Sequence, residues 1–314
     1  MGNCWVFRSF WTVPTNFNGS PECLLDMNRI PIPSNTSIGH VHLQVAGLDR
    51  SLAFYQALLG FQEIGRSGST VLLSSSGKLP AHIILTALPG ARPKPPRTTG
   101  LFHIAIRLPE RIALSQVFRH LLEGRWPVQG ASDHGVSEAL YLSDPDGNGL
   151  ELYVDRPRQD WPWVGGQVAM VTEPLDLQAL LAESDKHPWK GLHPATDIGH
   201  IHLQVSDLAR AEAFYSGLLG LDITQRSYPG AVFLSAGGYH HHLGLNIWAG
   251  RGAPPPPADA VGLFAYQVEI PDPSARQQVL ERMEAAGLSV EEWSLDGQIA
   301  GAMLRDPDGI QVLL

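Results

Sequence analysis

Cysteine is almost absent from this sequence. Cys4 and Cys23 are the only two among 314 residues, and both lie near the start. The rest of the chain therefore contains neither a disulfide framework nor a thiolate metal site, as is typical of proteins from the reducing cytoplasm. We expect a cytoplasmic protein. No apolar run approaches the ~20 residues needed to span a bilayer, so we expect no membrane partner.

Positive charge is also scarce. The chain has 22 Lys and Arg against 31 Asp and Glu, which gives a formal charge of −9. Since no basic cluster offsets this charge, we expect no nucleic-acid partner. The length suits about two domains with sizeable cores. The opening residues differ in composition from the remainder, and we expect residues 1–35 to form a disordered extension.

The strongest organising feature is an internal repeat. IGHVHLQV, from Ile38, reappears 160 positions later as IGHIHLQV, from Ile198. An offset of 162 pairs GLFHIAIRL, from Gly100, with GLFAYQVEI, from Gly262. Each half divides again into two smaller units that have the order strand, helix and several strands. The sequence therefore predicts four βαβββ units.

The hydrophobic pattern places elements within these units. In the first unit we expect a helix over 49–59 and strands over 41–45, 70–74 and 82–87. In the second we expect a helix over 111–123 and strands over 101–108, 139–143 and 149–154. The two domains predicted from these units cover 36–155 and 198–314. The segment 156–197 between them is expected to be a linker with a short helix at LDLQALLAE.

Two polar side chains stand out on these strands. Alternation in GLFHIAIRL puts His103 on the face opposite the apolar side chains of Phe102, Ile104, Ile106 and Leu108. In the strand GLELYV, Glu151 lies opposite Leu150, Leu152 and Val154. A strand histidine is more often simply hydrogen-bonded or exposed. Together, however, a histidine and a glutamate on polar strand faces are candidate ligands for one divalent metal.

Four such units with metal-type residues on their first and last strands resemble the vicinal oxygen chelate superfamily. Its members include extradiol ring-cleaving dioxygenases, glyoxalases and antibiotic-resistance proteins. The strings GHIHLQVSDL, SAGGYHHHLGLNIW and DHGVSEALYLSDPDGNGLELY are most similar to the bacterial catechol 2,3-dioxygenase group with two such domains. The resemblance covers the chain from Ile38 to the end. It implies an α+β fold in which four βαβββ modules form two domains with cupped mixed sheets.

The resemblance also implies which residues bind the metal. If the second unit pairs with the third, the ligands are His103, Glu151 and His200. If units instead pair in chain order, His40 replaces His200. The fourth unit lacks ligands, because it has Ala265 and Leu313 where the second unit has its histidine and glutamate.

The string GYHHHLGLNIW favours pairing of the second and third units. As a strand it would place His240, His242, Asn246 and Trp248 on one face, whereas the first half keeps only His82 at the equivalent place. Three adjacent histidines could also be a structural hydrogen-bonded cluster. We therefore expect the third unit to face the metal, and the other pairing stays open.

Two histidines and one carboxylate are typical of non-haem Fe(II) oxygenases. The resemblance implies an extradiol dioxygenase that uses Fe(II) to insert O2 into catechol or a substituted catechol. A glyoxalase-like isomerase or lyase using Mn(II), Zn(II) or Ni(II) is one alternative. A resistance protein that binds an aromatic drug is another. A homo-oligomer is compatible with either.

Ring cleavage needs a proton shuttle, and a histidine with an unperturbed pKa of ~6.5 suits this role. We expect His242 to be the shuttle, or His82 if units pair in chain order. Tyr141, ten residues before Glu151, resembles the family tyrosine that hydrogen-bonds substrate. The predicted substrate-binding set is His240, His134, Asn246, His82 and Trp248. DPDGNG is expected to be a tight turn.

Overall fold

The computed structural model describes residues 30–184, 189–295, 297 and 299–314. The predicted disordered extension falls mainly on residues 1–29, outside the described residues. Within its last part, Ile32 is buried, and its backbone N–H donates to the carbonyl of Gly220 at 3.3 Å. Residues 30–35 thus include a segment packed on the third unit.

Four successive βαβββ units make up the chain, as predicted. The first contains β1 (Ser37–Val45), α2 (Leu48–Leu52), its π-helical continuation η1 (Ala53–Leu58), β2 (Gln62–Ser67), β3 (Thr70–Ser74) and β4 (Ile83–Ala87). The second contains β5 (Gly100–Leu108), α3 (Arg111–Glu123), β6 (Gly130–Asp133), β7 (Ser137–Ser143) and β8 (Gly149–Asp155). The α+β fold class is confirmed.

The second half repeats this plan. Its first unit contains β12 (Asp197–Gln204), α5 (Leu208–Glu212), η3 (Ala213–Leu218), β13 (Asp222–Gln225), β14 (Ala231–Ser235) and β15 (Leu243–Asn246). The fourth unit contains β16 (Gly262–Glu269), α6 (Pro273–Ala285), β17 (Glu291–Leu295), β18 (Ile299–Arg305) and β19 (Gln311–Leu313). No helix among the described residues is both long and apolar enough to cross a membrane.

The segment between the halves is more ordered than a plain linker. It contains η2 (Arg158–Asp160), β9 (Trp163–Val164), β10 (Gln167–Val168), β11 (Glu173–Pro174) and α4 (Leu177–Glu183). The short helix expected at LDLQALLAE is present as α4. Its N-cap is Asp176, whose carboxylate accepts from two backbone N–H groups of the first turn. Strand β11 pairs with β6, so this segment extends the sheet of the second unit.

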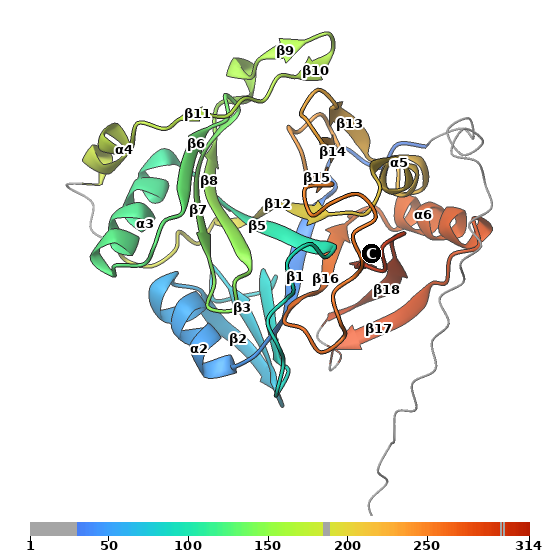
Figure 1. The fold of residues 1–314 in the computed structure, drawn as a ribbon, viewed down its shortest axis with the longest axis horizontal. Helices are drawn as coiled ribbons and strands as arrows, with labels where there is room; N and C mark the ends of the chain where they lie inside the picture. Colours follow the sequence, from blue (N-terminus) through green and yellow to red (C-terminus); the bar gives the residue numbers. More distant parts are fainter. Residues whose placement is uncertain (1–29, 185–188, 296, 298) are drawn as a thin grey trace, which may run out of the picture.

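Units pair across the two halves rather than within them. One sheet of nine strands has the order β11-β6-β7-β8-β5-β12-β15-β14-β13 and combines the second and third units. The other, of eight strands, has the order β17-β18-β19-β16-β1-β4-β3-β2 and combines the fourth and first. Figure 1 shows β5 beside β12 and β1 beside β16 near the middle, with the helices on the outer sides. Each curved sheet therefore spans both of the sequence segments predicted as domains.

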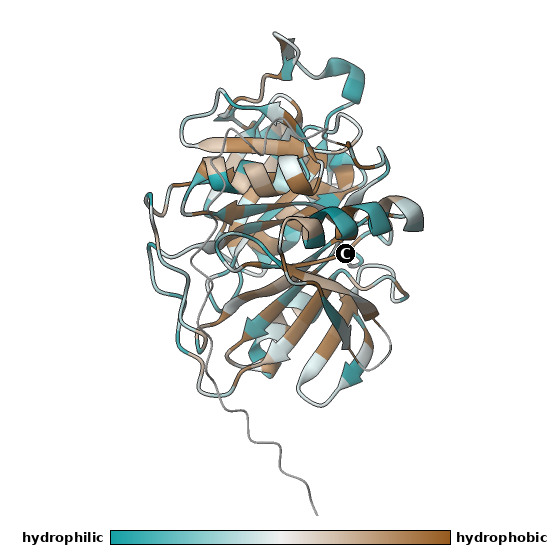
Figure 2. Cartoon of the chain, turned by 90° about the vertical axis from the view of Figure 1, so that its right-hand side faces the viewer, coloured by the Kyte–Doolittle hydropathy of each residue, from teal (hydrophilic) through white to brown (hydrophobic). Residues whose placement is uncertain are grey.

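Helices cover the sheets with apolar stripes. In α3 the buried side chains of Leu114, Val117, Phe118 and Leu121 recur at helical spacing on one face. They join Ile104 and other strand residues in a single large core. The strands accordingly carry long hydrophobic stretches (Figure 2). Burying each such side chain contributes roughly 1.5–3 kcal/mol.

One predicted strand face is wrong at its first residue. In the pairing of β12 with β5, His202 lies opposite His103 and the next residue, Leu203, lies opposite Leu101. Phe102 therefore has no partner on β12 and is the extra residue of a β-bulge. Leu101 takes the core side, whereas Phe102 is 38% exposed with its ring 5.2 Å from that of His103. Phe102 therefore joins the polar side of the sheet.

The DPDG segments are structural turns, as expected for DPDGNG. Asp144 Oδ1 accepts from the backbone N–H groups of Asp146 and Asn148 at 2.8 and 2.9 Å. Its other oxygen accepts from the buried hydroxyl of Tyr55 at 3.1 Å. Tyr215 and Asp306 repeat this contact in the second half. The motif thus ties the helix of one unit to the last hairpin of the next.

Candidate metal centre and its cavity

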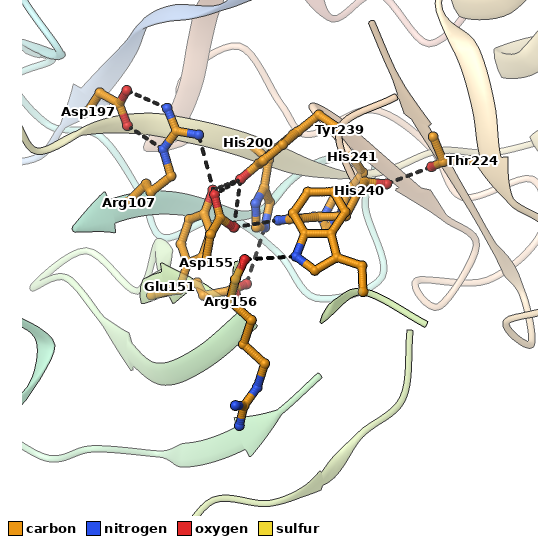
Figure 3. Close-up of polar contacts among 12 residues, drawn as sticks. Arg107, Glu151, Asp155, Arg156, Asp197, His200, Thr224, Tyr239, His240 and His241 are labelled. Carbon is orange, nitrogen blue, oxygen red and sulfur yellow. Dashed lines mark hydrogen bonds and ion pairs between the residues drawn. The ribbon is translucent and has the colours of Figure 1, made fainter. Parts of the chain in front are cut away.

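Three neighbouring strands bring the predicted ligands together. His103 lies on β5, Glu151 on β8 and His200 on β12, and β5 is hydrogen-bonded to both other strands. Their candidate ligand atoms all lie within 4.8 Å of one another. The Nε2 atoms of His103 and His200 are 3.1 and 3.3 Å from Glu151 Oε2. Figure 3 shows His200 and Glu151 pointing toward each other.

The burial and charge of these side chains suit a cation. His103, Glu151 and His200 are 7%, 3% and 1% exposed. Burial alone would raise the pKa of Glu151, but the imidazoles of His200 and His103 outweigh it and hold this pKa well below its usual value. Burial lowers the pKa of His200 to about 4. An ionised carboxylate and a neutral imidazole are the forms that bind metals.

An orphaned atom supports the same conclusion. His103 Nε2 is buried and has no hydrogen-bond partner within the described part of the chain, although it lies close to the Glu151 carboxylate. A buried polar atom without a partner is costly unless a ligand satisfies it. The donor set of two imidazoles and one carboxylate therefore fits a catalytic metal ion with open coordination positions.

A second bulge, on β12, sets the orientation of His200. Ile198 faces Ile106 and His200 faces Ala105, so Gly199 is the extra residue. A Cβ atom at Gly199 would lie 1.7 Å from the Tyr153 hydroxyl oxygen, so a side chain there would require displacement. The missing side chain lets β12 approach Tyr153 and places His200 on the face that carries His103.

A cavity of about 500 Å³ opens beside His103 and Glu151, which line it. This volume lies in the usual range for small-molecule sites. Its aromatic lining consists of Phe102, Tyr141, Tyr228, Phe233 and Trp248. The rings of Phe102 and Trp248 meet edge to face, with centroids 5.2 Å apart. The cavity therefore offers a flat apolar ligand several ring faces next to the candidate metal ligands.

Tyr141 and His134, both predicted for the site, line this cavity. His134 Nδ1 lies 2.7 Å from the Val171 carbonyl, and since a carbonyl only accepts, the proton is on Nδ1. His134 Nε2 then accepts from the Tyr141 hydroxyl at 2.6 Å. Two fixed hydrogen bonds thus orient the phenol.

The three adjacent histidines lie differently from the prediction. Strand β15 begins only at Leu243, so strand alternation does not extend back through His240 and His242, and neither lines the cavity. His242 Nδ1 instead accepts from the Ala236 N–H at 3.1 Å. His241, which the prediction placed on the opposite face, lines the cavity with its ring 4.0 Å from that of His200.

The other predicted residues divide between the two sheets. Trp248 lines the cavity, whereas Asn246 is fully buried outside it and accepts from the Trp248 N–H at 3.0 Å. His40 lies on β1 and His82 directly precedes β4, so both belong to the first unit, whose strands are in the other sheet. His82 Nδ1 accepts from a backbone N–H at 3.2 Å, and His40 Nδ1 lies 2.9 Å from the side-chain oxygen of Gln267. The structure therefore groups His200, not His40, with the other two candidate ligands.

His202 is a cavity residue that the predicted site did not include. His202 is buried, lines the cavity and lies with its ring perpendicular to that of His103 at 5.0 Å. Its place two residues after His200, on the same face of β12, is a signal that could have identified it. In the eight-stranded sheet two of the three equivalent positions are apolar, since Ala265 and Leu313 pack with Met303, and only His40 keeps a metal-type side chain.

Known proteins share this architecture. The family model described as the Glyoxalase/Bleomycin resistance protein/Dioxygenase superfamily matches residues 37–152 and 197–314. A catechol-2,3-dioxygenase of Bacillus subtilis (strain 168) is 46% identical over 265 residues, which are 83% of this chain and 92% of that protein. The biphenyl-2,3-diol 1,2-dioxygenase 3 of Rhodococcus globerulus is 28% identical over 138 residues, 41% of this chain and 70% of that protein.

A solved structure shows the same fold at low identity. Glyoxalase I of Zea mays overlays with a TM-score of 0.53 at 17% identity, covering 89% of this chain and 92% of that chain. The match of the family model to both halves agrees with the repeat and with the four βαβββ units. The chain belongs to the Glyoxalase/Bleomycin resistance protein/Dioxygenase superfamily, and within it is a catechol-2,3-dioxygenase-like enzyme.

Proposed function

We propose that this protein is an extradiol dioxygenase that uses Fe(II) to insert O2 into catechol or a substituted catechol. The observation that carries the proposal is the grouping of His103, Glu151 and His200 beside an aromatic-lined cavity. Two histidines and one carboxylate with open positions are the ligand set of non-haem Fe(II) oxygenases. When bound, the metal supplies the redox chemistry that lets a diol react with dioxygen.

The cavity residues account for binding of an aromatic diol. Phe102 and Trp248 offer ring faces and edges to the substrate ring. Tyr141 gives its proton to His134, so its oxygen has lone pairs left to accept a hydrogen bond from a substrate hydroxyl. The apolar and aromatic lining accommodates the substrate ring. The few polar atoms of the lining then orient the two diol oxygens toward the candidate ligands.

We assign the proton transfer to His241 instead of His242. Of these two histidines, His241 lines the cavity and His242 does not. His242 Nδ1 accepts a hydrogen bond from a backbone N–H, and its ring stacks on that of Tyr239 with centroids 4.9 Å apart. In this role His241 takes a proton from one diol oxygen and returns it later in the reaction. General acid–base catalysis of this kind contributes about 10²–10⁴-fold in rate.

The test is an assay of metal-free protein loaded anaerobically with one metal at a time. Fe(II) should give O2 consumption and a yellow ring-fission product from catechol, and Zn(II), which has no redox chemistry, should give neither. Full iron occupancy without O2 consumption would overturn the proposal. Turnover of an isomerase substrate without O2 would instead support the glyoxalase-like alternative.

Mn(II) belongs in the same assay for a specific reason. A manganese-dependent 2,3-dihydroxybiphenyl 1,2-dioxygenase of Geobacillus genomosp. 3 is 28% identical over 121 residues, 37% of this chain and 36% of that protein. If activity with Mn(II) exceeds that with Fe(II) at equal occupancy, the proposed metal is wrong but the proposed reaction is supported. The cytoplasmic location and a homo-oligomeric state stay predictions.

A further inference from the structure

A chain of hydrogen bonds runs from the cavity into the protein behind His241. His241 Nδ1 lies 2.8 Å from His240 Nδ1, and His240 Nε2 lies 2.9 Å from Asp155 Oδ1 (Figure 3). His240 is fully buried at 0% exposure. Asp155 ends β8, the strand that carries Glu151, so the chain begins on an element that also positions the candidate metal ligands.

The chemistry of the partners decides where the protons lie. Burial alone would raise the pKa of Asp155, but the hydrogen bond and charge of His240, and then the charge of Arg107, keep it below its usual value. An ionised carboxylate only accepts hydrogen bonds, so His240 Nε2 must be the donor. When His240 is neutral, its imidazole has one donor and one acceptor nitrogen, so Nδ1 is the acceptor. The proton between the two Nδ1 atoms therefore belongs to His241.

We propose that Asp155 and His240 are positioning residues that hold His241 in the tautomer with Nδ1 protonated and Nε2 bare. In that tautomer the nitrogen left for the cavity is a proton acceptor, as removal of a diol proton requires. The consequence for catalysis rests on the proposed function. The tautomer itself does not, since it follows from the hydrogen bonds between an ionised Asp155, a neutral His240 and His241.

The carboxylate is held in place by other donors. Arg107 Nη1 lies 3.4 Å from Asp155 Oδ2, and the same guanidinium forms two hydrogen bonds with Asp197 at 3.0 and 2.7 Å. The Tyr239 hydroxyl lies 3.0 Å from Oδ1 and 2.9 Å from Oδ2, so it contacts both oxygens. The Arg107 guanidinium can only donate hydrogen bonds. An asparagine at position 155 would therefore place its amide oxygen, the remaining acceptor, on the Arg107 side.

This geometry makes Asp155→Asn an informative variant. The amide oxygen takes the Oδ2 place beside Arg107, so the amide NH2 faces His240 Nε2 and donates to it. His240 then carries its proton on Nδ1, and His241 must accept there and protonate Nε2. A protonated Nε2 cannot take the diol proton. The substitution therefore reverses the tautomer with little change in shape.

The matched control is Thr224→Val. The Thr224 hydroxyl donates to the backbone carbonyl of His240 at 2.6 Å and so contacts the same residue without touching its imidazole. Loss of this hydrogen bond perturbs the packing around His240 but leaves the hydrogen bonds from Asp155 through His240 to His241 in place. A purely structural role of the segment would affect both variants alike.

The first measurement is imidazole nitrogen NMR of the metal-free, full-length protein, with the His241 signals identified by their loss in His241→Gln. We expect Nδ1 to be protonated and Nε2 to be bare. A protonated Nε2 in the wild type, as an imidazolium at His240 would cause, overturns the proposal. This measurement needs no turnover, so it stands even where the proposed dioxygenase reaction fails.

The second measurement compares the variants. Asp155→Asn should reverse the His241 tautomer and lower kcat for catechol by about 10²-fold, with KM little changed, because general base catalysis is lost. Thr224→Val should keep both the tautomer and kcat. An unchanged tautomer in Asp155→Asn, or equal losses of kcat in both variants, contradicts the assignment. Where Asp155→Asn does not fold, the wild-type spectrum decides alone.

Discussion

Tyr141 lies directly opposite Glu151 across strands β7 and β8, so the phenol and the candidate ligand share one face of the sheet. Burial, with the charge of Glu151, raises the pKa of Tyr141 well above its usual value. The phenol therefore keeps its proton near neutral pH, while its oxygen lies 2.6 Å from His134 Nε2. Tyr141 is a fixed hydrogen-bonding group rather than a base.

Tyr141→Phe should lower kcat/KM for catechol about 10-fold, because one substrate hydrogen bond worth roughly 1.4 kcal/mol is lost. Initial rates at matched metal content test this. Metal content itself should not change, since Tyr141 is not one of the grouped ligands. An unchanged kcat/KM would show that the phenol does not contact substrate.

His200→Ala and His40→Ala form a matched pair, because the repeat equates the two positions and both side chains are buried. Loss of a direct ligand should weaken metal binding more than about 100-fold, since even groups behind metal ligands affect affinity by 10–100-fold. His40→Ala should bind metal like the wild type. Metal content after dialysis, with circular dichroism to check folding, measures both. Equal metal loss in the two variants would contradict the assigned centre.

His42 should make stability depend on pH. Burial, with the charge of His40, lowers the pKa of His42 to about 3, against ~6.5 in the unfolded chain. Below pH ~6.5 the unfolded state binds a proton that the folded state does not, so stability is full above that pH and is lost as pH falls toward 3. In metal-free protein, His42→Gln should lose less unfolding free energy than the wild type between about pH 7 and pH 4.5.

Urea unfolding at several pH values measures this difference. Thr86→Val is the control, since it removes the 2.8 Å hydrogen-bond partner of His42 Nε2 but keeps the titrating imidazole. That variant should retain the pH slope of the wild type. Parallel slopes for wild type and His42→Gln would show that His42 does not account for the dependence.

Gly199→Ala should destabilise the fold by about 1–3 kcal/mol, because the new Cβ meets the Tyr153 hydroxyl oxygen at 1.7 Å. Adding Tyr153→Phe should recover part of the loss by removing that oxygen. Gly217→Ala is the control, since no atom of the described residues lies within 4 Å of its Cβ position. Denaturant midpoints compare the three. A Gly199→Ala protein as stable as the control would show that β12 can shift without cost.

Much of the candidate site was predictable from local pattern. Alternation placed His103 and Glu151 on polar strand faces, and both line the cavity. The prediction failed at Phe102 because a bulge adds a residue that alternation does not reveal. It also assigned His242 where the structure has His241, because β15 starts later than the hydrophobic pattern indicates. In both cases strand pairing changed which side chain faces the cavity.

The sequence by itself determined four βαβββ units, the repeat, and the residue types available as metal ligands, because periodicity and turn chemistry are local properties. Only the tertiary structure decided that the second unit pairs with the third. That choice depends on how whole sheet edges and apolar faces fit, which no single segment encodes. The same pairing places His200 beside Glu151, and leaves His40 with Gln267 in a sheet that has Ala265 and Leu313 at the other two corresponding positions.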